Sequence, residues 1–144
     1  MSPLTRKIVF AISFESLGIV LASGLLLLIS SASPDQTLIL SAINAAVALL
    51  WNFTFNAAFE HWEARQPIKG RPLFLRATHA VLFEGGLTLL MVPFMAWWLQ
   101  ITLWQSFLFE AALIILFLVY TYAFTWAFDR IFGLPASARP DIAP

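Results

Sequence analysis

The sequence contains no cysteine and only two histidines. Without cysteine the chain can form no disulfide, no thiolate metal site and no cysteine nucleophile. His61 and His79 are too few for a histidine metal site unless several carboxylates converge on them. No GxGxxG phosphate loop and no nucleophile with an adjacent base appears at motif spacing. We therefore expect no enzyme activity, cofactor, bound metal or nucleic acid partner.

Charge is also scarce. Charged residues make up 11% of the chain and hydrophobic residues 60%, with a mean hydropathy of +0.84. Soluble proteins average about 25% charged residues, so this composition is that of a membrane protein.

Four apolar segments reach the roughly 20 residues that a helix needs to span a bilayer. They are Ile8 to Ser30, Leu38 to Phe59, Leu73 to Leu99 and Leu103 to Phe128. Short breaks separate the first from the second and the third from the fourth, which makes these neighbours antiparallel. The sequence predicts an all-α integral membrane protein with four transmembrane helices.

The basic residues all lie before the first segment, between the second and the third, in the first turn of the third, or after the fourth, and these places face the same side of the membrane. They are Arg6, Lys7, Arg65, Lys69, Arg71, Arg76, Arg130 and Arg139. None lies in the first or the third break. By the positive-inside rule, this multi-pass chain has both termini and its middle connection in the cytoplasm.

Sequence motifs of the first half of the chain recur in the second half, always the same number of residues later. Lys7 to Gly18, KIVFAISFESLG, returns as Arg76 to Gly86, RATHAVLFEGG, with Phe83-Glu84 in the place of Phe14-Glu15. Each unit contains two helices, so both units have the same orientation. We predict two tandem parallel transmembrane pairs, residues 1–69 and 70–133, followed by a disordered tail, residues 134–144.

Each unit carries one acid inside a helix of bilayer length, Glu15 and Glu84. An acidic or basic side chain at a helix centre costs about 2.5 to 3.5 kcal/mol on insertion scales, so such residues usually have a function. A carboxyl group shielded from water favours its proton, whereas an approaching cation favours the ionised form. We interpret both acids as coupling sites for protons and substrate. A structural hydrogen bond between helices is the alternative for Glu15.

The second helix carries polar and aromatic residues at intervals of four. The candidates for the substrate path on this helix are Trp51, Asn52, Phe55, Asn56, Phe59 and Glu60. For the amides, hydrogen bonding between helices is an equally good interpretation. For the aromatics, core packing is the alternative to a pocket for flat cations.

Two further candidates for the substrate path lie in the second unit. His79 precedes Glu84 by about a turn and a half, where it could relay protons through water or simply make a hydrogen bond. Glu110 lies near the start of the fourth helix, where it is either an outer gate or a side chain that reaches the interface.

Four motifs carry a resemblance to a known family. They are KxxFAxxFE (Lys7 to Glu15), WNFTFNAAFE (Trp51 to Glu60), RxxHAxxFEGG (Arg76 to Gly86) and YTYAFTWAFD (Tyr120 to Asp129). Together they resemble the proteobacterial antimicrobial compound efflux family, which is built from two bacterial transmembrane pair domains. The likeness covers residues 6 to 130.

The resemblance implies an inner-membrane transporter that exchanges protons for cationic biocides such as chlorhexidine or acriflavine, with short diamines as natural substrates. In the family the acid of the first helix is tied to coupling, and that acid falls on Glu15. The acid early in the fourth helix matches Glu110. One departure is that Phe10 stands where the family usually has histidine, which puts a proton relay in the first unit in doubt.

Four helices of this size enclose little volume, so we expect a homodimer in contact with membrane lipid. Two alternatives remain. A small multidrug resistance transporter also uses one glutamate in its first helix, but it lacks the duplication seen here. A membrane assembly or sensor subunit would pair its acids with basic residues of a partner and would transport nothing alone.

Overall fold

A computed structural model describes residues 1–67, 70 and 72–134. It contains four α-helices, α1 (Pro3–Ile29), α2 (Pro34–Ala64), α3 (Leu73–Leu99) and α4 (Leu103–Phe132). The predicted four-helix architecture is confirmed, and all four helices are long and apolar enough to cross a membrane. The predicted tail, except for Leu134, lies outside the described residues.

Helices α1, α2 and α4 extend beyond their predicted apolar segments because turns with polar residues at their ends continue each helix. Helix α2 begins after Ser33, whose backbone N–H donates to the side chain of Gln36 at 3.2 Å. Helix α4 begins after Thr102, whose hydroxyl accepts from the backbone N–H of Gln105 at 3.1 Å. Ser33 and Thr102 occupy equivalent places of the two repeats, so the helices that follow them start in the same way.

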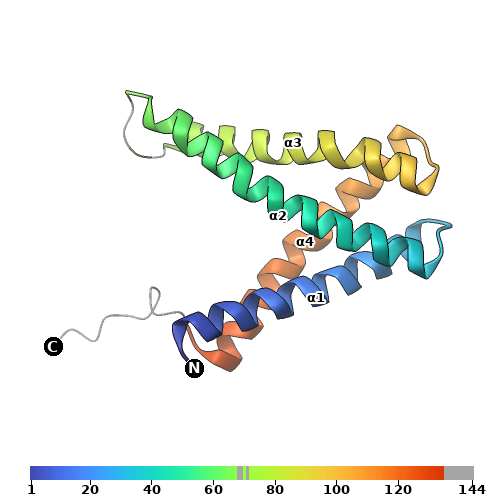
Figure 1. Ribbon diagram of the computed structural model, residues 1–144, viewed down its shortest axis with the longest axis horizontal. Coiled ribbons are helices and arrows are strands. Elements are labelled where there is room, and N and C mark those ends of the chain that lie inside the picture. Colours follow the sequence, from blue (N-terminus) through green and yellow to red (C-terminus); the bar gives the residue numbers. More distant parts are fainter. Residues whose placement is uncertain (68–69, 71, 135–144) are drawn as a thin grey trace.

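The four helices form a ring in which each packs mainly against two neighbours: α1 against α2 and α4, and α3 against α2 and α4. Figure 1 shows that α1 and α4 diverge from α2 and α3 toward one end of the molecule. That end holds the starts of α1 and α3 and the ends of α2 and α4, and we call it the basic end. The opposite end holds the two short connections, residues 30–33 and 100–102, and we call it the loop end.

The buried core lies toward the loop end. Ala22, Leu26, Leu40, Met95 and Leu113 form one cluster that joins all four helices. Burial of these side chains, together with their close packing, holds the two helix pairs together at this end.

Buried hydroxyl groups reinforce the same end in both repeats. Ser23 and Thr37 share a hydrogen bond of 2.9 Å between α1 and α2. At the equivalent place, Ser106 of α4 donates to the carbonyl of Val92 in α3 at 2.6 Å. The repeats therefore correspond in their contacts as well as in their sequences.

Candidate functional site

A cavity of about 1100 Å³ lies between the α1–α4 pair and the α2–α3 pair. Its lining extends from Ala22 and Leu113 in the core to Asp129 near the basic end. Small-molecule sites usually measure about 300–1,000 Å³, so a cavity of this size admits a drug-sized compound.

Three of the predicted acids line this cavity, although they come from three different helices. Glu15 and Glu84 are more accessible, whereas Glu110 is buried, with 3% of its surface accessible. The sequence repeat places the first two acids at equivalent positions of α1 and α3. The structure thus brings together the two predicted coupling residues and the predicted gate.

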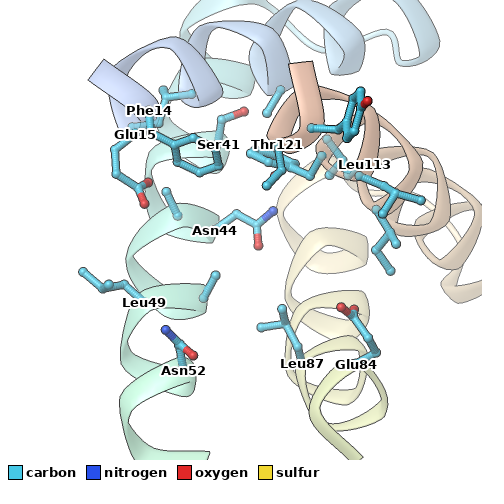
Figure 2. A pocket seen from close by; sticks show the side chains of 18 of the residues that line it. Phe14, Glu15, Ser41, Asn44, Leu49, Asn52, Glu84, Leu87, Leu113 and Thr121 are labelled. Carbon is cyan, nitrogen blue, oxygen red and sulfur yellow. The ribbon is translucent and has the colours of Figure 1, made fainter. Parts of the chain in front are cut away.

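Amide groups of α2 complete the polar part of the lining. Asn52, a predicted residue of the substrate path, lines the cavity, and so does Asn44 two turns earlier. Figure 2 shows both on α2, with Glu84 and Leu87 on the facing helix α3. Within residues 1–67, 70 and 72–134, no group of three or more His, Asp or Glu is placed to hold a metal ion.

The other predicted residues of the substrate path do not line the cavity. They are Trp51, Phe55, Asn56, Phe59, Glu60 and His79. The ring of His79 contacts those of Phe55 and Phe59 edge-on, with centroids 5.1 and 4.8 Å apart. Asn56 Oδ1 lies 2.8 Å from Nε2 of the same histidine. Except for Glu60, which is exposed near the basic end, these residues join α2 to α3, and their part in a substrate path stays a prediction.

The same interface recurs between α4 and α1, but its hydrogen-bonded pair is replaced. Phe10 takes the place of His79 and contacts Phe124 and Phe128 edge-on, with centroids 5.3 and 5.0 Å apart. Thr125 takes the place of Asn56 in the repeat. Both members of the hydrogen-bonded pair are therefore replaced together, and aromatic packing remains.

Each predicted coupling acid follows a residue whose carbonyl group accepts a hydrogen bond from a neighbouring helix. The indole Nε1 of Trp51 donates to the carbonyl of Phe83 at 3.0 Å, just before Glu84. The hydroxyl of Tyr120 donates to the carbonyl of Phe14 at 2.8 Å, just before Glu15. These equivalent bonds fix the turns that carry the two acids into the cavity wall.

The basic end of the α1–α4 pair is held by an ion pair between Arg6 and Asp129. Arg6 also donates to the carbonyl of Gly133 and lies 5.1 Å from the ring centroid of Phe128. Asp129 lines the cavity as well, so the pair links this end of the cavity to the start of α1.

Three residues that line the cavity, Ser41, Asn44 and Asp129, were not among the predicted site residues. A signal for each exists in the sequence. Asn44 lies two turns before Asn52, Asp129 repeats the place of Glu60, and Ser41 repeats the place of Glu110. Applying the repeat to every acid would have found Asp129 and Ser41.

Comparisons with known proteins agree with this architecture. A family model described as chlorhexidine efflux transporter matches the chain twice, at residues 2–65 and 71–134. A short-chain diamines transporter of Acinetobacter baylyi is 32% identical over 126 residues, covering 88% of this chain and 89% of that protein. One of Acinetobacter baumannii is 33% identical over 132 residues, covering 88% and 87%. No solved structure matches the chain.

The double match agrees with the repeat seen in the helices and in their contacts. The matches at residues 2–65 and 71–134 each cover one pair of helices, so the predicted architecture of two tandem two-helix repeats is confirmed. Because the family and the relatives are transporters, the chain is a multi-pass membrane transporter and not an enzyme. The chain belongs to the family of chlorhexidine efflux transporters, as its four motifs had indicated.

Proposed function

We propose that the protein exports cationic small compounds from the bacterial cytoplasm in exchange for protons. The observation that carries the proposal is a cavity lined by Glu15, Glu84, Glu110 and Asp129, with no lysine or arginine among its described lining residues. Such a lining attracts cations. The family description and the names of the relatives support chlorhexidine and short-chain diamines as substrates, and acriflavine has the same kind of charge.

Exchange follows from competition for the carboxylates. An ionised carboxylate in the cavity binds an ammonium or amidinium group, whereas a protonated one has lost the charge that holds it. Aromatic rings such as Phe14 and Phe117 line the same cavity and stabilise flat cations through their faces. Proton uptake from the outside therefore expels the bound cation.

The arrangement of the helices supports an inward-facing state. The core closes the loop end, while the helix pairs diverge toward the basic end (Figure 1). Under the positive-inside rule the basic end is cytoplasmic, with both chain termini on that side. Alternating access would then require the α1–α4 and α2–α3 pairs to close at the basic end and to separate at the loop end.

The surroundings of the transporter are part of the proposal. We place it in the inner membrane of a bacterium, where a proton gradient is available. Large apolar side chains such as Leu28 and Leu89, which are 85% and 78% exposed, would contact lipid or a second copy in a homodimer.

We expect the purified protein alone to accumulate acriflavine in liposomes when a pH gradient is imposed. Protein that is inserted with its basic end outward should take up the dye when the interior of the liposome is acidic. Uptake should stop when a protonophore collapses the pH gradient, and the direction of transport should reverse when the gradient is reversed. Fluorescence quenching of the dye measures the rate against protein-free vesicles. A subunit that needs a partner would give only the protein-free rate, and that result would contradict the proposal.

We also expect the binding of a quaternary ammonium cation, whose own charge does not titrate, to tighten as the pH rises. Below the apparent pKa of the site a proton must leave before the cation binds, and above it no proton is displaced. Affinity should therefore rise by about tenfold per pH unit for each displaced proton and then level off. Calorimetry in buffers of different ionisation enthalpy counts the released protons. A constant affinity from about pH 5.5 to 8.5 would exclude competition at these carboxylates.

A further inference from the structure

Two buried polar groups at the closed end of the cavity have no hydrogen-bond partner. They are Oε2 of Glu110 and Oγ of Ser41, and both residues are only 3% exposed. Among the residues that the structure describes, these are the buried side-chain oxygen and nitrogen atoms left without a partner. Both residues also line the cavity, so a ligand can reach them.

The two residues occupy the same place in the two repeats. Ser41 follows Leu40 of the buried core on α2, and Glu110 lies about one turn before Leu113 of the same core on α4. They are therefore held by the best-packed part of the fold. Because one repeat has serine where the other has glutamate, this end of the cavity carries its charge on one side only.

An unpaired charge at this depth is unstable unless a ligand neutralises it. A buried carboxylate requires hydrogen-bond donors and a compensating charge, or else it takes up a proton. No described lysine or arginine lines the cavity to supply them. A ligand ammonium group has three donors and a positive charge, so it can bind the carboxylate and the serine hydroxyl together.

A second acid is placed to bind the other end of such a ligand. Glu84 lines the same cavity and lies within electrostatic reach of Glu110. Figure 2 shows the carboxylate of Glu84 on α3, across the cavity from Asn44 and Asn52 of α2. A single cation can neutralise one of these two like charges, whereas a molecule with two ammonium groups neutralises both.

We propose that Glu110 and Ser41 bind one ammonium group of a linear diamine while Glu84 binds the other. This subsite rests on the proposed function and deepens it, because it assigns the residues that distinguish diamines from monoamines. Glu15 then remains outside the diamine pair.

The test compares cadaverine with pentylamine, which share a five-carbon chain and differ by one amine. Titration calorimetry on the purified full chain should show that the wild-type protein prefers cadaverine by about tenfold or more, since truncating a buried charge pair usually costs at least that much. In Glu110→Gln the preference should disappear through weaker cadaverine binding, with pentylamine binding unchanged within about threefold. Ser41→Ala should lower the preference in the same direction by a smaller factor.

The control is Asp35→Asn, which removes an exposed acid outside the cavity and should leave the preference intact. If Glu110→Gln keeps the preference, or weakens both amines equally, the subsite is wrong. If that variant does not fold, Glu110→Asp provides the test, and it should weaken cadaverine but not pentylamine. A wild-type protein that binds neither amine would instead contradict the proposed export of cations.

Discussion

We expect Glu15→Gln to lower proton-driven export to the rate of protein-free vesicles while the protein still inserts and folds. Glutamine keeps the shape of the side chain but can neither release a proton nor attract a cation with a full charge. Glu15 is exposed and lines the cavity, so the change creates no buried void and should alter the free energy of unfolding by no more than about 0.5 kcal/mol. Acriflavine quenching in liposomes measures the rate, and thermal unfolding in detergent measures the stability.

Asp35→Asn is the matched control for this loss. It removes a carboxylate of the first turn of α2 that is exposed and does not line the cavity. Export by this variant should match the wild type, because the lost charge is outside the exchange site. Wild-type rates in Glu15→Gln, or an equal loss in both variants, would remove Glu15 from the mechanism.

The two predicted coupling acids, Glu15 and Glu84, are equivalent in the repeat but differ in their surroundings. Glu84 has Glu110 as an electrostatic neighbour, whereas the residue in the equivalent place for Glu15 is Ser41. The second repeat therefore brings two acids within electrostatic reach of each other, whereas the first repeat has one acid and one hydroxyl group at these places. This arrangement agrees with the proposal that Glu84 and Glu110 bind the two ammonium groups of a substrate, which leaves Glu15 for the exchange of protons.

The helices and the duplication could be predicted because both depend on local sequence. A run of about 20 apolar residues has few structural alternatives in a bilayer. Helix α3 was predicted residue for residue, Leu73–Leu99, since polar or proline-containing segments flank it on both sides. The other helices were predicted too short, because capping groups and polar end turns lie outside the apolar runs.

The composition of the cavity wall could not be predicted in full. The spacing of residues shows which of them share a face of a helix, but not whether that face packs on another helix or lines the cavity. Asn52 and Asn56 lie one turn apart on the same polar stripe of α2. The first lines the cavity, while the second bonds to His79 of α3. The outcome depends on how α3 packs along α2, and this follows from long-range contacts that periodicity does not contain.

Gly86→Ala should destabilise the protein by about 1 to 3 kcal/mol, the usual cost of overpacking. A Cβ atom at Gly86 would overlap Cζ2 of Trp51 and lie 2.8 Å from its Cη2. The indole cannot move aside without cost, since it donates to the carbonyl of Phe83 and packs on Phe55 with centroids 5.4 Å apart. Its displacement would separate α3 from α2 at the turn that carries Glu84, so transport should also fall.

Gly85→Ala is the matched control, because a Cβ at Gly85 meets nothing within 4 Å. Alanine is favoured over glycine inside a helix by about 1 kcal/mol, and both variants gain this contribution. The two neighbouring substitutions should therefore shift stability in opposite directions, with the contact to Trp51 deciding the sign. Thermal unfolding followed by tryptophan fluorescence measures both shifts. Equal stabilisation by the two alanines would show that Trp51 does not pack against α3 at Gly86.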